Sequence, residues 1–375
     1  MARIIRWDTR NSPVAATGCL LLTLCLSCAG EKEAEADALV PAPAVTPQVV
    51  TLQGSTMGTT YHVKVVAKDA AQSEEAVGLQ TKIDAALELV NDQMSTYRPK
   101  SELSRFNALS STEPFPVSAE TARVTSRALE IGRLTQGAFD VTLGPLIALW
   151  GFDRGDKRQT PPSPEQIAET RKKVGLSRLH VEGSALRKDD AGMYVNLSGI
   201  AKGWGVDRIH DILVESGFDD FMVEIGGEVR ARGLHPRGAP WRIGINTPKS
   251  DADPEAILLA VPLKNTALAT SGDYRNFFES DGRKYTHILS PDSGRPVDRE
   301  LVSASILAAD CTTADALATA AIVLGAERTR EILRTHFPGI EALFVHKPKP
   351  GNTAFQVSQT EGFPAKLSPA PGKAP

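Results

Sequence analysis

The chain has 375 residues, of which 41% are hydrophobic and 23% charged, and a formal net charge of −3. These values are typical of a soluble globular protein with one large or two smaller domains. The charge is not basic enough to indicate nucleic-acid binding, and after the first 30 residues no apolar run is long enough to span a membrane.

The first 27 residues have the pattern of a bacterial lipoprotein signal peptide. A positively charged start is followed by an apolar stretch from Val14 to Leu26 and then by "LSCAG". The apolar stretch is too short to be a spanning helix, which favours a cleaved signal. The small Ser27 directly before Cys28 predicts cleavage there and lipid attachment to the cysteine.

Two neighbouring residues bear on this prediction. Cys25 stands where such signals usually carry leucine, and the alternative is a soluble secreted protein cut near Gly30. Ala29, rather than aspartate, follows the cysteine. A lipidated chain is therefore expected in the outer membrane, facing the periplasm.

The folded part is expected between two weakly patterned segments. Residues 28–47 are acidic and then rich in Pro and Ala, which is typical of a tether. Residues 347–375 form a Pro- and Lys-rich tail that we expect to be disordered. Residues 48–346 remain as one mixed α/β unit. Its single cysteine, Cys311, leaves no intramolecular disulfide to stabilise it.

Helix and strand patterns follow one another along this unit. Two strands around a glycine-containing turn are predicted in "VVTLQGSTMGTTYHVKVVA". A helix in "KIDAALELVNDQMS" has one apolar stripe, and a second, in "AETARVTSRALEIGRLTQG", is expected to end with Gly137 at the C′ position. Further strands are predicted at "FMVEIG", "WRIGIN", "ILLAVPL", "TALAT", "VSASILAA" and "ALFVH". This order favours an α+β fold, a single domain with antiparallel sheets flanked by helices.

The stretch "VNLSGIAKGWGVDRI", residues 195–209, begins like a strand and continues like a helix. Val195 and Leu197 alternate with polar residues, and the apolar spacing then lengthens toward Ile209. Glycine costs about 1 kcal/mol relative to alanine in a helix interior. Gly203 and Gly205 therefore indicate that something approaches this backbone closely.

Two further motifs each allow a structural and a functional interpretation. Asp140, in "GAFDVT", follows a helix end and is either a turn or cap residue or part of a site. Gly226 and Gly227 follow a predicted strand. They either form a turn or let a flat or phosphorylated ligand reach the backbone.

The segment "CTTADALATAAIVLG" carries two oxygen-bearing side chains one helical turn apart. With a helix beginning at Thr312, Asp315 falls at N3 and forms a variant of the capping box. Thr319 lies at i+4, so both oxygens project from one face, although its hydroxyl can also bond back to the preceding turn. A carboxylate, a hydroxyl and one backbone carbonyl make a partial oxygen shell for Mg²⁺, to be completed by water and phosphate oxygens.

The motif "THILSPDSGRPV" places His287 at the end of a predicted strand. A histidine in such a place is commonly a hydrogen-bonded structural residue. Because its unperturbed pKa lies near neutrality, His287 is nevertheless the best candidate for a general base.

Eight motifs together carry a family resemblance. In chain order they are "STMGTTY", "MSTYRPKSELSRFN", "GAFDVT", "NLSGIAKGWGVD", "VEIGGEVRARG", "ATSGDY", "THILSPDSGRPV" and "TADALATAAIVLG". Over about residues 50–330 the chain resembles the ApbE-type FAD:protein FMN transferases. The resemblance implies a T-fold-related domain that cleaves FAD with a divalent metal. It also implies that FMN is attached to a threonine hydroxyl of an acceptor flavoprotein and that AMP is released.

The resemblance further implies roles for individual residues. The FAD site would include Met57, Tyr97, Ala138, Phe139, Asp140, Asn196, Lys202 and Ile288. The metal, Mg²⁺, would be bound by the carbonyl of Gly199 and the side chains of Asp315 and Thr319. On this interpretation the glycines of residues 195–209 are present because pyrophosphate and metal approach the chain.

One position departs from the family pattern, which usually has aspartate where this chain has Asn196. Asparagine keeps the acceptor oxygen, adds an NH₂ donor and removes a charge. Two other functions would use the same residues. One is an FAD pyrophosphatase in which water replaces the threonine, and the other is a non-catalytic flavin-binding lipoprotein.

Overall fold

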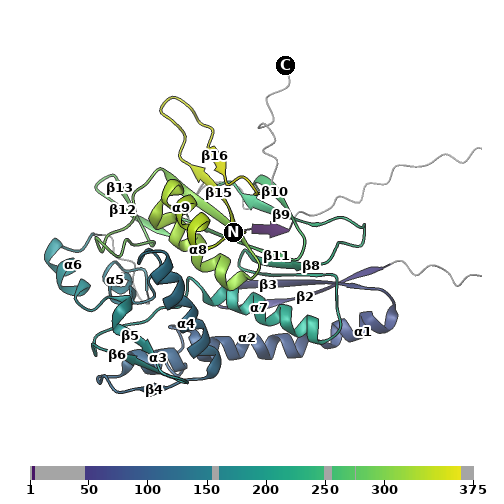
Figure 1. The fold of residues 1–375 in the computed structure, drawn as a ribbon, viewed down its shortest axis with the longest axis horizontal. Helices are drawn as coiled ribbons and strands as arrows, with labels where there is room; N and C mark the ends of the chain where they lie inside the picture. Colours follow the sequence, from purple (N-terminus) through teal and green to yellow (C-terminus); the bar gives the residue numbers. More distant parts are fainter. Residues whose placement is uncertain (1, 5–46, 154–159, 249–255, 275, 365–375) are drawn as a thin grey trace, which may run out of the picture.

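The computed structural model describes residues 2–4, 47–153, 160–248, 256–274 and 276–364 (Figure 1). Most of the predicted signal and tether, including Cys28, lies outside these residues. Among the helices that are described, none combines the length and the apolar character needed to cross a membrane.

An antiparallel sheet occupies the centre of the described part of the chain (Figure 1). Its eight strands run in the order β16-β15-β14-β11-β8-β7-β3-β2. Every strand predicted from Phe221 onward is confirmed, in this sheet, in the small sheet described below or, for the strand that ends before His287, in a separate hairpin. The bounds are β2 (Gln48–Thr56), β3 (Thr59–Ala67), β7 (Phe221–Ile225), β8 (Glu228–Arg232), β11 (Thr266–Gly272), β14 (Leu301–Ala308), β15 (Glu341–His346) and β16 (Gln356–Gln359).

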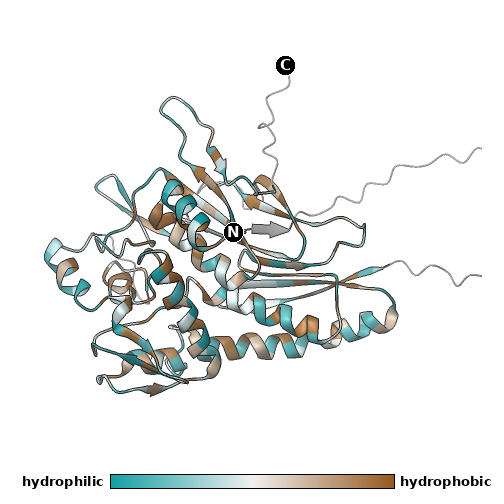
Figure 2. Cartoon of the chain, viewed as in Figure 1, coloured by the Kyte–Doolittle hydropathy of each residue, from teal (hydrophilic) through white to brown (hydrophobic). Residues whose placement is uncertain are grey.

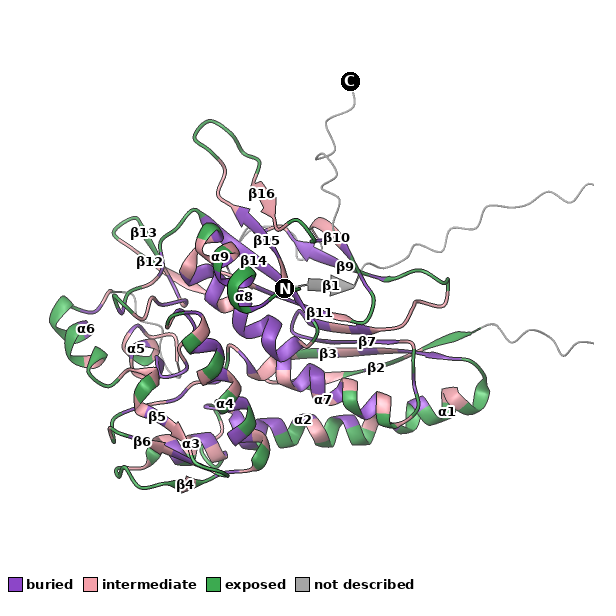
Figure 3. Cartoon of the chain, in the orientation of Figure 1, coloured by how far each residue is buried: buried purple, intermediate pink, exposed green. Residues whose placement is uncertain are grey.

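Helices pack on one face of this sheet. The predicted apolar stripe of α2, formed by Ile83, Leu87, Val90 and Met94, is buried as expected. Figure 2 shows that the outer faces of the surface helices are hydrophilic. α8 is different, since almost all of its residues are buried between the sheet and its helical neighbours (Figure 3). The helices are α1 (Ala70–Gly78), α2 (Gln80–Met94), α7 (Ala201–Glu215), α8 (Cys311–Leu324) and α9 (Ala326–His336).

The opposite face of the sheet is covered by a small sheet in the order β1-β9-β10. Its strands are β1 (Ala2–Ile4), β9 (Trp241–Asn246) and β10 (Ile257–Leu263). Trp241 and Ile243 pack with Val229 and Leu268 of the central sheet in one buried cluster. β1 falls within the predicted signal.

A second group of elements packs beside the α8 end of the sheet (Figure 1). It contains a three-stranded sheet in the order β4-β6-β5 and a separate hairpin, β12-β13. The bounds are α3 (Glu102–Ala108), β4 (Phe115–Pro116), α4 (Ala119–Leu134), α5 (Gly144–Leu149), α6 (Pro164–Arg171), a 3₁₀ turn (Leu176–Arg178), β5 (Leu179–Val181), β6 (Ala185–Lys188), β12 (Phe277–Ser280) and β13 (Arg283–Thr286).

Three local predictions need correction. Thr135 caps α4 and Gln136 takes the C′ position with φ 56°, so Gly137 lies one residue later than predicted. The strand predicted to start at Val195 is absent, because residues 195–197 have no regular secondary structure. Part of the tail expected to be disordered is folded, because β16 pairs with β15 and Phe363 is buried against the sheet. Residues 365–375 lie outside the described residues.

Candidate functional site

A cavity of about 400 Å³, here called the inner cavity, lies between the start of α7, the middle of α8, the end of β11 and the loop after α4. It brings together residues that are far apart in the sequence. Eleven of the twelve predicted site residues line it: Tyr97, Ala138, Phe139, Asp140, Asn196, Gly199, Lys202, His287, Ile288, Asp315 and Thr319.

Met57 is the predicted residue outside the inner cavity. It lies in the β2–β3 turn with φ 50° and lines an adjoining cavity of about 910 Å³. Tyr97, Asn196 and Lys202 line both cavities. The two spaces therefore adjoin along these side chains, as an elongated ligand would require.

The floor of the inner cavity contains a lysine paired with a carboxylate. Lys202 Nζ lies 2.6 Å from Glu228 Oε2, and the Glu228 side chain is only 3% exposed. Burial alone would lower the pKa of Lys202, but the nearby carboxylates of Glu228 and Asp315 raise it overall. Lys202 is therefore a fixed cation in this floor.

Burial is the main reason why the pKa values of the Glu228 and Asp315 carboxylates are raised. Burial raises the pKa of Glu228 to about 7, against the lowering effect of Lys202. The pKa of Asp315 is also raised by burial and is lowered in part by Lys202 and by the backbone N–H of Gly203. This N–H donates to Asp315 Oδ2 at 3.0 Å, which fixes the carboxylate against α7.

Asp315 does not cap its helix, contrary to the prediction. α8 begins at Cys311, and the cap is Asp310, whose side chain accepts the N–H of Thr313 at 2.7 Å. Asp315 lies in the second turn and contributes no capping bond to α8. The capping-box interpretation of Asp315 is therefore wrong, and its carboxylate belongs to the α7–α8 contact.

Thr319 lies one turn after Asp315 on the same helix. Its hydroxyl oxygen is 3.2 Å from the hydroxyl of Ser271 at the end of β11. A Cβ added at Gly199 would lie 3.3 Å from Thr319 Oγ1, so the Gly199 backbone directly faces this hydroxyl. The hydroxyls of Thr319 and Ser271 therefore lie together in the cavity that Asp315 also lines, with the Gly199 backbone beside Thr319.

His287 follows the end of β13, as predicted. Its Nδ1 lies 3.2 Å from the carbonyl oxygen of Asn276, and Phe152 packs against the ring edge with centroids 6.4 Å apart. A carbonyl can only accept, so Nδ1 carries the proton of the neutral ring and Nε2 is left as an acceptor. Burial lowers the pKa of His287, which keeps the ring neutral at neutral pH.

Asp140 and Asn196 both form local turns as well as lining the cavity. Asp140 Oδ1 accepts from the backbone N–H of Thr142 at 2.7 Å and from its hydroxyl at 2.6 Å. Asn196 Oδ1 accepts the N–H of Ser198 at 2.9 Å, in the turn that leads into α7. The acceptor oxygen that asparagine shares with aspartate thus has a structural use here.

The glycines around residues 195–209 have a different reason from the one predicted. A Cβ at Gly203 would lie 2.3 Å from the Cys311 carbonyl oxygen, and one at Gly205 would lie 2.8 Å from Met57 Cε. Both glycines therefore permit close packing of the protein on itself. Of the three, Gly199 alone lines the inner cavity. The prediction that pyrophosphate and metal require all of these glycines is wrong.

The paired glycines Gly226 and Gly227 have positive φ angles of 58° and 107° and form the β7–β8 turn. They are not among the residues that line the inner cavity. The structural interpretation of this pair is the right one.

Comparison with known proteins identifies the family. The sequence pattern of the ApbE family matches residues 57–344. The chain belongs to the ApbE family. A FAD:protein FMN transferase of Vibrio cholerae serotype O1 is 43% identical over 357 residues, covering 95% of this chain and 100% of that protein. A FAD:protein FMN transferase of Haemophilus influenzae is 40% identical, covering 76% of this chain and 83% of that protein.

Solved structures of the ApbE family have the same fold. The flavin transferase ApbE of Vibrio cholerae superposes with a TM-score of 0.75 at 42% identity, covering 84% of this chain and 98% of that one. The apo form of the Pseudomonas stutzeri flavinyl transferase ApbE also gives 0.75, at 35% identity, covering 84% and 96%. These structures confirm the predicted α+β fold.

Two residues of this ApbE-family site were missed from the sequence. Glu228 and Ser271 lie in motifs that carry the resemblance, yet neither was singled out. The one sequence signal for Glu228 was its position directly after the two glycines, at the start of the predicted strand. Nothing in the sequence distinguished Ser271 from other hydroxyl residues, because its proximity to Thr319 depends on the β11–α8 packing.

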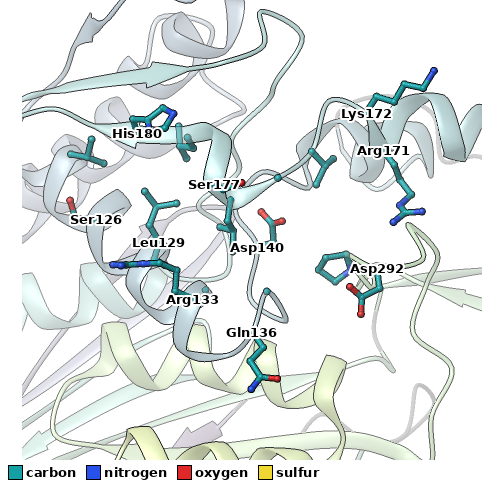
Figure 4. Close-up of a pocket in the computed structure, with 18 of the residues that line it drawn as sticks. Ser126, Leu129, Arg133, Gln136, Asp140, Arg171, Lys172, Ser177, His180 and Asp292 are labelled. Carbon is teal, nitrogen blue, oxygen red and sulfur yellow. The ribbon is translucent and has the colours of Figure 1, made fainter.

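A larger cavity of about 1190 Å³, here called the outer cavity, shares Asp140 with the inner cavity. Figure 4 shows Asp140 among the residues that line the outer cavity. Asp140 is the one predicted site residue that lines it. Arg133, Arg171, Lys172 and Asp292 border it, and all four are exposed. Among its described lining residues there is no counterpart of the Lys202–Glu228 pair of the inner cavity.

Proposed function

We propose that this chain transfers FMN from FAD to a threonine hydroxyl of an acceptor flavoprotein, with release of AMP. The observation that carries the proposal is the inner cavity of an ApbE-family chain, where a half-buried lysine, a carboxylate–hydroxyl pair and a neutral histidine meet. A lysine and a divalent cation suit a diphosphate, and a neutral histidine suits a hydroxyl nucleophile.

The cation we propose is Mg²⁺. Its protein donors would be Asp315, Thr319 and the carbonyl of Gly199, and we add the hydroxyl of Ser271 because it lies beside that of Thr319. This set consists only of oxygen, which suits a hard cation. Among the described residues no group of three or more His, Cys, Asp or Glu could hold a metal ion, so phosphate and water oxygens would complete the shell. When bound, Mg²⁺ would offset the charge that develops on the phosphates.

The transfer would proceed by displacement at the FMN phosphorus. The acceptor threonine oxygen forms a bond to this phosphorus, while the bond from phosphorus to the oxygen bridging toward AMP breaks. AMP leaves with that oxygen and its electron pair. The threonine proton passes to Nε2 of His287, and Lys202 neutralises charge on the departing phosphate.

The test is incubation of the purified chain with FAD, MgCl₂ and a candidate acceptor flavoprotein. We expect one FMN attached to an acceptor threonine, seen by intact-mass and peptide mass spectrometry, and one AMP released per attachment. Free FMN and AMP with an unmodified acceptor would support the pyrophosphatase instead. Bound FAD that stays intact would support the non-catalytic flavin-binding protein.

We also propose that the chain is a lipoprotein anchored through Cys28 in the outer membrane and facing the periplasm. The proposal rests on the signal pattern and the acidic, Pro/Ala-rich segment that follows it. The variant Cys28→Ala should leave the membrane fraction without loss of FMN transfer. A variant that still sediments with membranes would contradict lipid anchoring, and density separation of the two membranes tests the outer-membrane assignment.

A further inference from the structure

Glu228 is the buried acid in the inner cavity for which the proposed function has no role. It begins β8, directly after the Gly226–Gly227 turn, and its carboxylate holds Lys202 Nζ at 2.6 Å. Lys202 has to be available to a diphosphate, yet in this structure its ammonium is tied to Glu228. A polar partner placed in this way controls where the cation points.

The charges around the inner cavity are unbalanced. Among its described lining residues the acids are Asp140, Glu228 and Asp315, and Lys202 is the one cation, because His287 is neutral. Burial raises the pKa of Glu228 to about 7, so its full negative charge is present only above neutral pH, where the FAD affinities are compared. A diphosphate brings about two further negative charges. Like charges repel each other more strongly in such a partly buried site than in bulk water, because the effective dielectric constant is lower there. Without an added cation, the floor therefore disfavours the diphosphate.

We infer that Glu228 is a positioning residue that holds Lys202 and makes FAD binding, and not only transfer, depend on the divalent cation. This inference rests on the proposed function for its ligand. With Glu228 neutralised, Lys202 would be free to pair with the diphosphate and would need less help from a metal. With Glu228 charged, the floor accepts the diphosphate only together with a cation.

The experiment measures FAD affinity of the full chain by flavin fluorescence, once in EDTA and once in saturating MgCl₂. In the wild type we expect affinity to be at least about 100-fold weaker in EDTA. Glu228→Gln should reduce this difference in affinity between EDTA and MgCl₂ about tenfold, because it should bind FAD more tightly in EDTA. The matched control is Glu224→Gln, because Glu224 is a buried glutamate in the same β7–β8 hairpin that pairs with His62 outside the cavity. For Glu224→Gln, the difference in FAD affinity between EDTA and MgCl₂ should equal that of the wild type.

Three outcomes decide the inference. Glu228→Gln that binds FAD in EDTA no better than the wild type would overturn it. Should that variant fail to fold, Glu228→Asp is the second variant, because it keeps the negative charge. It should keep the wild-type difference in FAD affinity between EDTA and MgCl₂, and it should lower kcat more than it changes KM for FAD. A smaller difference in affinity would overturn the role of charge. Transfer by the wild type is a separate readout: its loss contradicts the proposed function, whereas an unchanged difference in affinity in Glu228→Gln with wild-type transfer intact contradicts only the role of Glu228.

Discussion

The inner and outer cavities meet at Asp140 but differ in what surrounds them. The outer cavity has about three times the volume of the inner one, at about 1190 Å³ against 400 Å³. Its charged side chains are mostly exposed, and water already solvates them. The inner cavity instead buries Glu228 and Asp315 around Lys202.

This difference shows why volume is a poor guide to the site. Burying charged groups costs free energy unless they are paired, and exposed charges carry no such cost. A fold that maintains two buried acids and one base at a cavity wall gives up stability to keep them there. Perturbed groups of this kind mark candidate functional sites. The inner cavity is therefore the site that mutagenesis should test, with the outer cavity as its internal control.

The largest expected effect is that of Asp315→Ala. Transfer should fall by about 10³ or more, because loss of the proposed metal ligand would remove several kcal/mol of charge stabilisation in the transition state. The melting temperature should change little, since one hydrogen bond, from Gly203, is lost at a cost of about 1 kcal/mol. Activity assays and thermal melts measure the two effects separately.

Asp292→Ala is the matched change in the outer cavity and should transfer FMN at the wild-type rate, since Asp292 is exposed. Full activity of Asp315→Ala with unchanged metal dependence would show that this carboxylate only joins α7 to α8. Equal losses in both variants would contradict the assignment of the inner cavity.

His287→Ala should lower the transfer rate by about 10²–10⁴, the usual contribution of a general base, and should leave FAD and metal binding unchanged. The control is His180→Ala, because His180 borders the outer cavity and pairs with Asp189 at 2.9 Å. Transfer is followed by mass spectrometry and affinity by flavin fluorescence. Parent-rate transfer by His287→Ala would make this histidine structural and leave the metal to activate the hydroxyl.

The pH dependence of the transfer rate should also report on His287. A histidine acts as a base only when neutral, so with His287 as the proposed base transfer should rise with pH through the pKa of His287. Because burial lowers that pKa from an ordinary value of about 6.5, the rise should be complete below the pH expected for an exposed histidine. The acid limb should be absent from the residual rate of His287→Ala. If the rate of His287→Ala still rises with pH over the same range, the titrating group is not His287.

Periodic patterns in the sequence predicted most of the fold. The stripe of Ile83, Leu87, Val90 and Met94 needs only a helix and one buried face, and it was confirmed. The hairpin at residues 48–67 likewise follows from local alternation and a turn. By contrast, the pairing of β16 and the burial of Phe363 depend on the edge of a sheet formed by distant strands, which no local pattern reveals.

The site was predicted less completely than the fold. Motif resemblance brought eleven residues to one cavity without any knowledge of distances. It did not reveal that Glu228 would pair with Lys202, because that contact joins the start of β8 to the start of α7. Nor could it separate a glycine required by a ligand from one required by a neighbouring helix. That distinction depends on what a missing Cβ would meet.

The smallest effect that we predict sharpens this last distinction. At Gly203 a Cβ would lie 2.3 Å from the Cys311 carbonyl oxygen and 2.9 Å from Asp315 Cβ, so Gly203→Ala must push α7 and α8 apart beneath the inner cavity. Overpacking of this kind costs about 1–3 kcal/mol. Chemical denaturation should show this loss, with FAD still binding in MgCl₂.

The control for Gly203→Ala is Gly78→Ala at the end of α1, where a Cβ would meet nothing within 4 Å. This change should stabilise the chain by about 0.4–1 kcal/mol, because alanine has less backbone freedom in the unfolded state. The two substitutions therefore differ in sign although their chemistry is the same. If Gly203→Ala were as stable as the parent and instead lost FAD affinity, the glycine would serve the ligand after all, and the original interpretation of residues 195–209 would stand.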